Sequence, residues 1–158
     1  MDVTSLVSRV MDAFGTNPNK LVKNNHFWVF IGVMKISFAK VTGFEQDVDK
    51  EYIVEGGVND YGIQLIVPKK ERRILRFERG LQTWNPVLTR MKPGVHIPAG
   101  ITVIIMNDRN VPVQVYHASD CVVTKWEVGE FNANTGEVLI ETFEVSYTSC
   151  DRTNLQLL

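Results

Sequence analysis

After residue 25, apolar and polar residues alternate in short runs of the kind that form β-strands. The runs are HFWVFIG, MKISFAKV, EYIVE, RRILRFER, GITVIIMND, VPVQVYH, CVVTKWEV and GEVLIETFEVSY. ITVIIM lacks polar alternation, which predicts a central strand covered on both faces. About seven short strands with turns between them predict a mainly β fold, an antiparallel barrel or sandwich.

Near the N-terminus, apolar residues recur every three or four positions, which predicts a short amphipathic helix. The stripe consists of Val3, Leu6, Val7, Val10, Met11 and Phe14. This stripe could cover an open end of its own β domain or dock on a neighbouring chain, and the sequence does not decide between the two. We therefore divide the chain into residues 1–25, the helix and a polar link, and residues 26–158, the β domain. A second short helix is expected near Trp84.

The composition limits the function classes. A 44% hydrophobic and 22% charged chain of 158 residues is typical of one ordinary soluble domain. The formal net charge of −1 argues against a dedicated nucleic-acid binder. No apolar run approaches the roughly 20 residues of a membrane-spanning helix, so no membrane insertion is expected. Cys121 and Cys150 lack metal-type spacing, and we expect reduced, partly buried thiols of a protein made in the cytoplasm.

Candidate catalytic groups are sparse. The three histidines are far apart and belong to no motif such as HExxH: His26, His96 and His117. Glu137, Glu141 and Glu144 invite comparison with the paired carboxylates of glycosidases. On a strand, however, Glu137 and Glu141 would share one face and Glu144 the other, which favours an exposed charged edge. No Lys-Ser or Lys-Thr follows Gly56-Gly57, so this is no phosphate loop. We expect no catalytic residue, no metal and no cofactor.

The stretch Phe38–Gly62, FAKVTGFEQDVDKEYIVEGGVNDYG, stands apart from the rest of the chain. A strand-like run turns at Gly43, continues through charged and apolar residues, and breaks at Gly56-Gly57. It contains no His, Cys or Ser that could act as base or nucleophile. This pattern predicts a long, polar, extended arm suited to contact with another protein.

One strand concentrates basic residues. They are Arg72, Arg73, Arg76 and Arg79. On a strand they would lie on alternate faces, between apolar residues and the acidic Glu71 and Glu78. A surface that pairs with an acidic protein and a solvated strand face are both compatible with this pattern.

Four phrases resemble the tail-tube proteins of contractile phages and related injection systems. They are FAKVTGFE (Phe38–Glu45), EYIVEGGVNDY (Glu51–Tyr61), ILRFERG (Ile74–Gly80) followed by Trp84, and GEVLIETFEVSY (Gly136–Tyr147). Each phrase alone is a loose β pattern, but the four occur in the family's order and spacing, and the resemblance runs from about Phe27 to Asn154. IVPKKERRI departs from the family's Pro-Gly-x-x-Lys-Tyr/Phe phrase, and Tyr147–Asp151 replaces its His-Glu-Gly-Leu close.

The resemblance implies a β-barrel-like subunit of the inner tube, with no enzymatic activity. Its partners would be other copies of itself in stacked hexameric rings, sheath and baseplate proteins, and DNA or protein cargo that passes without sequence-specific binding. After synthesis in the bacterial cytoplasm, the protein would belong to the tail of a virion or an injection particle. A tube-initiating, baseplate-proximal ring is the nearest alternative. A β-barrel ligand-binding protein or enzyme is the distant one.

The resemblance also assigns contact residues. The arm would reach the adjoining ring through Phe44, Asp47, Asp49, Lys50, Glu51, Tyr52, Ile53, Glu55, Gly56, Gly57, Asn59 and Asp60. The basic strand, with Arg72, Arg73, Arg76 and Arg79, would face the sheath or a neighbouring subunit. A position in the lumen is less expected, because a wall rich in arginine would bind a phosphate chain and slow its passage.

Overall fold

The structure, a computed structural model, describes residues 5, 21–54, 56–57 and 62–155. This part of the chain holds 12 strands and one short helix, α2, so the mainly β class is confirmed. The elements are β1 (Phe27–Ile31), β2 (Met34–Ile36), β3 (Lys40–Thr42), β4 (Asp49–Ile53), β5 (Ile63–Val67), β6 (Arg73–Gly80), α2 (Pro86–Thr89), β7 (His96–Ile97), β8 (Ile101–Met106), β9 (Pro112–Ser119), β10 (Cys121–Val128), β11 (Ile140–Tyr147) and β12 (Ser149–Asn154). Helix α2 confirms the one expected near Trp84. The expected N-terminal helix lies outside the described residues, apart from Ser5.

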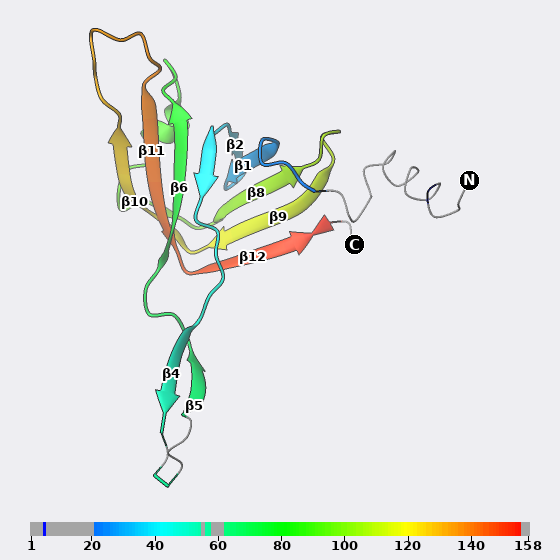
Figure 1. The fold of residues 1–158 in the computed structure, drawn as a ribbon. Coiled ribbons are helices and arrows are strands. Elements are labelled where there is room, and N and C mark those ends of the chain that lie inside the picture. Colours follow the sequence, from blue (N-terminus) through cyan, green and yellow to red (C-terminus); the bar gives the residue numbers. More distant parts are fainter. Residues whose placement is uncertain (1–4, 6–20, 55, 58–61, 156–158) are drawn as a thin grey trace.

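Ten of these strands form two antiparallel sheets that pack against each other. The first sheet has the order β12-β9-β8-β1-β2, and the second sheet has the order β3-β6-β11-β10-β7. The strands of the two sheets cross in Figure 1, where β6, β11 and β10 run along the long direction of the molecule and β8, β9 and β12 run across it. The remaining two strands, β4 and β5, pair only with each other.

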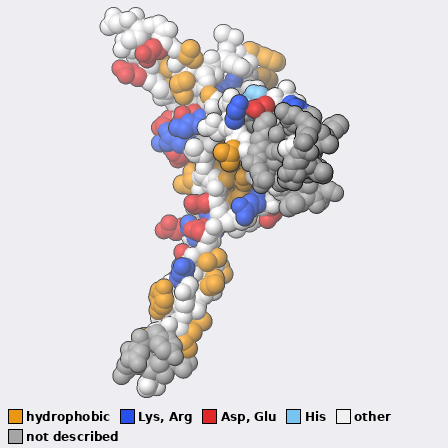
Figure 2. Space-filling view, turned by 45° about the vertical axis from the view of Figure 1, so that its right-hand side comes forward, with side chains coloured by type: hydrophobic (Ala, Val, Ile, Leu, Met, Phe, Trp, Pro, Cys, Tyr) orange, Lys and Arg blue, Asp and Glu red, His pale blue; other side chains and the backbone are white. Residues whose placement is uncertain are grey.

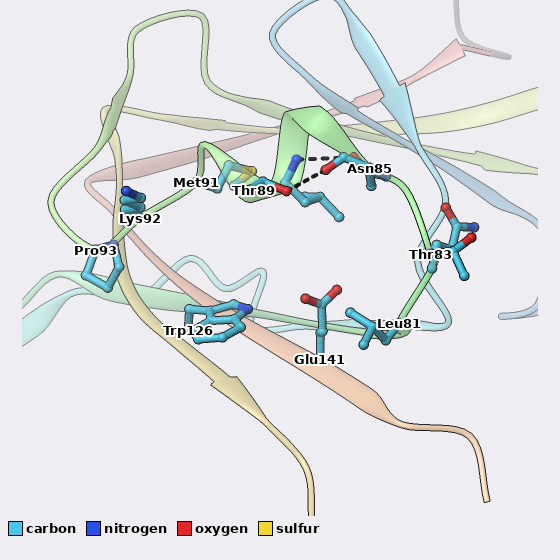
Figure 3. Close-up of a pocket in the computed structure, with 11 residues that line it drawn as sticks. Leu81, Thr83, Asn85, Thr89, Met91, Lys92, Pro93, Trp126 and Glu141 are labelled. Carbon is cyan, nitrogen blue, oxygen red and sulfur yellow. Dashed lines mark hydrogen bonds between the residues drawn. The ribbon is translucent and has the colours of Figure 1, made fainter. Parts of the chain in front are cut away.

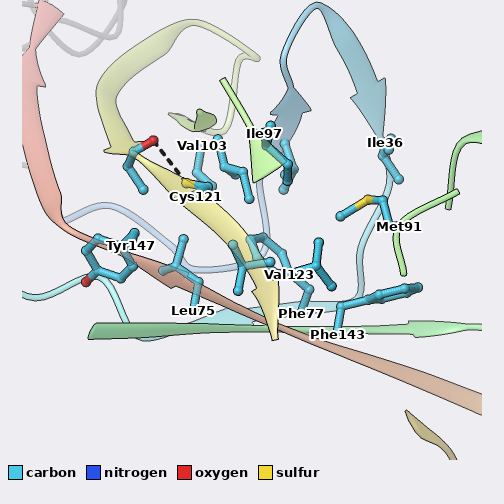
Figure 4. Packing of buried hydrophobic residues seen from close by; sticks show 14 of the residues in the cluster. Ile36, Leu75, Phe77, Met91, Ile97, Val103, Cys121, Val123, Phe143 and Tyr147 are labelled. Carbon is cyan, nitrogen blue, oxygen red and sulfur yellow. Dashed lines mark hydrogen bonds between the residues drawn. The ribbon is translucent and has the colours of Figure 1, made fainter. Parts of the chain in front are cut away.

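The core lies between the two sheets, and the alternation of the strands places it there (Figure 4). The largest fully buried side chains are Tyr147, Phe77, Phe143, Leu75, Ile101, Val29, Val123, Val145 and Cys121. Cys121 and Cys150 are free, buried thiols, and burial raises the pKa of Cys121 to about 11. The two thiols are not paired with each other, and both are more deeply buried than expected.

Two corners carry the chain from one sheet into the other, as is typical of sheets that cross. Asp120 joins β9 to β10 with a φ of 53°, and Thr148 joins β11 to β12. The Asp120 carboxylate accepts hydrogen bonds from the Thr148 hydroxyl at 2.5 Å and from Arg72 Nη1 at 2.9 Å. It also lies 3.1 Å from His96 Nε2. The Thr148 hydroxyl, His96 and Arg72 hold the pKa of Asp120 at about 2, so one carboxylate joins both corners.

A similar change of sheet divides a run that the sequence analysis treated as one strand. MKISFAKV forms β2 in the first sheet and β3 in the second. Phe38, in the break, packs against Phe77 with ring centroids 5.0 Å apart, and Ala39 N donates to Glu78 O. The side chain of Phe38 thus fills the core at the crossing, a contact that alternation alone does not reveal.

Other differences concern the ends and number of strands. Strands β5, β7 and β12 were not predicted, and β11 begins at Ile140, four positions after the expected Gly136. Glu137 therefore lies in a loop, which corrects its predicted placement on one strand face with Glu141. Strand β8 is central in the first sheet as predicted, but Ile104 and Ile105 are only half-buried, so its second face is not fully covered.

Candidate assembly interface

The β4–β5 hairpin projects away from the two packed sheets and forms the arm predicted from the sequence (Figure 1). Its strands pair in register from Asp49 with Val67 to Ile53 with Ile63. Opposed residues of an antiparallel pair point to the same side, so the register assigns every side chain to one of two faces. We call these arm face one, with Ile53, Ile63 and Leu65, and arm face two, with Tyr52 and Ile66.

Both arm faces carry uncovered apolar side chains in the single chain, beside charged or polar ones. On arm face two, Tyr52 and Ile66 are 67% and 69% exposed; on arm face one, Ile53, Ile63 and Leu65 are 48%, 48% and 40% exposed. Figure 2 shows hydrophobic side chains along the length of this projection. An isolated two-stranded hairpin is marginally stable in water and has no core of its own. Uncovered apolar patches of this kind mark contact sites.

The root of the arm, in contrast, is fastened firmly to the body. The hydroxyl of buried Tyr147 donates to Gly43 O at 2.6 Å and accepts from Glu45 N at 3.0 Å. The Gln46 side chain donates to Cys150 O at 2.5 Å. These bonds join the chain entering the arm to β11 and β12, which lie about a hundred residues later in the sequence.

A charged clamp joins the two strands where they leave the body. Asp47 Oδ2 accepts from Lys69 Nζ at 2.5 Å, and Asp47 Oδ1 accepts from Arg73 Nε at 2.8 Å. Arg73 Nη2 also donates to Asp47 O at 2.6 Å. The Lys69 hydrogen bond, with Arg73, holds the pKa of Asp47 below its usual value. Together with the hydrogen bonds of Tyr147 and Gln46, the clamp joins the base of the arm to the body.

The structure therefore separates the predicted contact residues into two groups. Phe44 packs on Tyr116 and Tyr147, with ring centroids 5.6 and 6.4 Å apart, and Asp47 belongs to the clamp, so both serve the root. Exposed on the free hairpin or at its tip are Lys50, Glu51, Tyr52, Ile53, Gly56 and Gly57, with Asp49 half-buried at the base. Glu55, Asn59 and Asp60 lie outside the described residues. The contact role of the whole set stays a prediction.

Sequence reasoning missed half of the arm. Strand β5 contributes Ile63, Leu65 and Ile66, none of which was named as a contact residue. The signal was present, because IQLIV is a short apolar run that ends at Pro68. It was overlooked because the arm was interpreted as ending at Gly62.

The two tip glycines differ in a way that can be tested. Gly57 has a φ of +102°, whereas the φ of Gly56 is not in the positive range; at neither would a Cβ meet a described atom within 4 Å. Gly57→Val should therefore strain the tip by about 1–2 kcal/mol, and Gly56→Val should not. We expect Gly57→Val to shorten tubes in electron micrographs. Because Gly56→Val causes no strain within the subunit, shorter tubes from this variant would instead indicate that a neighbouring molecule contacts the tip. Normal tubes from both variants would contradict a contact at the tip.

The four arginines of the basic strand do not share one surface. Strand β6 alternates as predicted, with Leu75 and Phe77 buried and Arg76 half-buried on the opposite face. Arg79 is only 3% exposed on the core side, so it presents no surface in this chain. Arg73 belongs to the clamp and Arg72 to the corners, which leaves Arg76 as the arginine on the outward face.

A cavity of about 340 Å³ lies between α2 and one end of the second sheet (Figure 3). Trp126 and Glu141 form its sheet side, and Asn85 and Thr89 form its helix side, where Asn85 caps α2 by accepting from Leu88 N at 3.2 Å. The described residues that line it include no Ser, Cys or His. Thr89, one of its two threonines, donates its hydroxyl to Asn85 O at 2.8 Å, a bond within the turn of α2.

The histidines make separate, local contacts. His26 Nδ1 lies 3.4 Å from Asn107 O, and His117 Nδ1 lies 2.9 Å from Thr102 Oγ1. His96 belongs to the corners. Within residues 5, 21–54, 56–57 and 62–155, no three His, Cys, Asp or Glu side chains are grouped as metal ligands would be. No helix in this part of the chain is long and apolar enough to cross a membrane.

A mainly β body with a projecting arm agrees with the family match. Residues 23–151 match the T4-like virus tail tube protein gp19 family. The chain belongs to this family. This tail tube protein is a structural protein and not an enzyme, and it is a component of a phage tail or of a contractile injection particle.

Solved structures show the same fold in similar proteins. A chain of the sheath-tube complex of an extracellular contractile injection system (PVC, extended state) is 14% identical, with a TM-score of 0.76 over 98% of this chain and 100% of that chain. A chain of the anti-feeding prophage tube-terminating cap is 11% identical, with a TM-score of 0.75 over 86% and 93%. A chain of the 6-fold symmetrised anti-feeding prophage baseplate is 21% identical, with a TM-score of 0.67 over 85% and 97%. A comparison with curated protein sequences finds no match.

Proposed function

We propose that this tail tube protein assembles into hexameric rings and that the rings stack, through the arm, into the hollow inner tube of a contractile tail or injection particle. The tube carries DNA or protein cargo inside a separate sheath and rests on a baseplate. The observation that carries the proposal is the arm, with a rigid root and two uncovered apolar faces.

The contrast between root and arm supports a contact with another copy. A flexible loop would lose conformational entropy on docking, whereas the clamp of Asp47, Lys69 and Arg73 has already ordered the base of the arm. Because both faces of the hairpin carry exposed apolar side chains, one flat surface can cover only one of the two apolar sets. A slot between two neighbouring subunits of the next ring covers both arm faces at once.

The second sheet supplies edges that suit ring closure. It begins with β3, and at its other side β7 pairs only with Cys121 and Val122 of β10. Val123 of β10 also exchanges backbone hydrogen bonds with Gly94 and Val95. The backbone of β10 from Thr124 onward and the outer side of β3 are open strand edges. A head-to-tail contact between β3 of one copy and β10 of the next would continue the sheet around a closed ring.

Sheath and baseplate contacts belong to the same proposal. The similar chains come from particles described as a sheath-tube complex and as a 6-fold symmetrised baseplate. By analogy of fold, we assign this chain the same neighbours and the same ring number. Cargo passes through the ring without sequence-specific recognition.

Electron microscopy of the purified protein tests this function. We expect rings with six subunits and stacked tubes whose growth depends on protein concentration. Rings that never stack would instead indicate a tube-initiating ring on a baseplate. A protein that stays monomeric at high concentration would contradict the proposal and favour a small-molecule binder that uses the cavity beside α2.

A further inference from the structure

The outward face of the second sheet carries a ladder of paired charges. It consists of the cations Lys40, Arg76 and Lys125 and the anions Glu78, Glu127 and Glu144. We call this set the charge ladder. It spans β3, β6, β11 and β10, four neighbouring strands of one sheet.

The strand register produces the ladder. Arg76 lies opposite Glu144, which lies opposite Lys125 on the next strand. In the adjacent row, Lys40 lies opposite Glu78. Cross-strand neighbours of opposite charge attract one another, and both rows follow this pattern.

Arg76 is surrounded by carboxylates. Its Nε lies 3.2 Å from Glu78 Oε1, its Nη1 lies 3.2 Å from Glu144 Oε1, and its Nη2 lies 3.5 Å from Glu127 Oε1. Lys125 Nζ contacts Glu127 at 2.9 Å, and this hydrogen bond lowers the pKa of Glu127. Three cations thus face three anions, and the face has no net formal charge.

Protein stability alone does not explain such a network well. An exposed ion pair typically contributes between nothing and about 1 kcal/mol to the free energy of unfolding. The other sheet shows that the fold does not require a charged outward face. The outward face of the first sheet is mostly apolar: it presents Trp28, Phe30, Ile104 and Val115, with Lys35 over the Trp28 ring and Asp151 on the outer strand β12. An apolar face of this kind suits contact with protein, and a charged, hydrated face suits water.

The direction of the strands relates these two faces to the tube. In Figure 1 the antiparallel strands β6, β10 and β11 lie roughly parallel to the long axis of the arm. If arms connect successive rings, these strands run along the tube, and the second sheet curves around its axis. One of its faces then covers the subunit core, and the other, with the charge ladder, faces the water-filled channel.

We propose that the charge ladder lines the channel of the tube, and that Glu78, Glu127 and Glu144 mask Arg76 so that a passing polyanion is not retained. This inference rests on the proposed tube assembly. From the sequence, the arginines of β6 were expected to lie outside the lumen, because a free arginine would bind a phosphate chain. That expectation did not take account of carboxylates paired with the arginine. With its guanidinium surrounded by three carboxylates, Arg76 attracts a phosphate chain far less than a free arginine does.

A charge-matched pair of variants tests the masking. In E78Q/E127Q/E144Q the channel wall loses three negative charges per subunit, so its net charge rises by three. The control, E130Q/E137Q/D151N, makes the same change in net charge at exposed positions in the loop before β11 and on the outward face of the first sheet. Tubes are assembled with a fluorescent single-stranded DNA, sedimented, and treated with nuclease.

We expect the channel variant to retain at least about tenfold more nuclease-protected DNA than wild type at low salt, with retention falling steeply as salt rises. The control should match wild type. Equal retention by the channel variant and the control would overturn the masking role. Failure of the wild-type protein to form tubes would instead overturn the proposed assembly, so the two failures are distinguishable.

A cysteine placed on the same face gives a second measurement that does not disturb the ladder. Ile74, 51% exposed, lies on the outward face of β6, and both native thiols are buried. In I74C tubes, a small maleimide should react while a maleimide coupled to a bulky protein should not; unassembled I74C should react with both. Reaction of the bulky reagent along intact tubes would place this face outside and overturn the inference, even if the charge variant failed to assemble.

Discussion

Replacing Tyr52 and Ile66 by serine is expected to stop rings from stacking while the subunit stays folded. Both side chains are more than half exposed in the single chain, so the fold loses little when they are shortened. In the tube each would be covered, and burial of a large apolar side chain contributes about 1.5–3 kcal/mol. Every copy in a ring loses the same contact, so the loss multiplies over the ring. Tube length in electron micrographs and the sedimentable fraction measure the effect, and the Tm of unassembled protein measures folding.

The other arm face supplies a parallel test. Ile53→Ser with Leu65→Ser should prevent stacking as well, because the proposal requires that both faces be covered. Gln64→Ser is the matched control, since Gln64 lies opposite Tyr52 on the same strand pair and is already polar. Normal tubes from one serine pair would mean that the corresponding arm face stays in water. Normal tubes from both would remove the arm from the contact between rings.

Gly43→Ala should produce a large loss of stability for the addition of a single methyl group. Gly43 has a φ of +108°, and an added Cβ would lie 2.1 Å from Ile74 O. The conformation costs about 1–2 kcal/mol for an L-residue, and the overlap with backbone costs about 1–3 kcal/mol more. The total of about 2–5 kcal/mol corresponds to a fall in Tm of roughly 5–15 °C. Thermal unfolding followed by circular dichroism measures it.

Two other glycines separate these contributions. Gly94 has a φ of +93°, and an added Cβ there would have no described atom within 4 Å. Gly94→Ala should therefore lower the free energy of unfolding only by the cost of the left-handed backbone conformation, about 1–2 kcal/mol. Gly136 has neither the positive φ nor a close neighbour, and Gly136→Ala should leave the Tm nearly unchanged. If Gly43→Ala were no worse than Gly94→Ala, the close approach of Gly43 to β6 would not constrain the fold.

Gly43 also connects stability to assembly. Its carbonyl accepts the Tyr147 hydroxyl at the root, and the chain passes from there directly into the arm. A shift of this residue would change the direction of the arm even in a subunit that still folds. Because ring contacts act together along a tube, a small error in arm direction repeated in every copy has a large effect on tube length.

Much of the fold follows from local pattern. The alternation of β6 was predicted, because a strand's period of two is a property of neighbouring positions. The arm was also foreseen, since a polar, extended stretch without catalytic residues has few other uses. Strands β7 and β12 gave weaker signals, because the first has only two residues and the second is mostly polar.

The sequence by itself determined a mainly β subunit with an arm and without catalytic chemistry, and its phrases indicated the tail-tube family. Only the tertiary structure decided what the charged residues do. Asp47 joins Lys69 and Arg73 in the clamp, and Arg76 meets Glu144 from a strand 68 positions away. Alternation states which face of a strand a side chain takes, but the partner on that face comes from pairing between distant strands. No local pattern contains that pairing. It places carboxylates from neighbouring strands around Arg76, in a strand that appears basic when its sequence is taken alone.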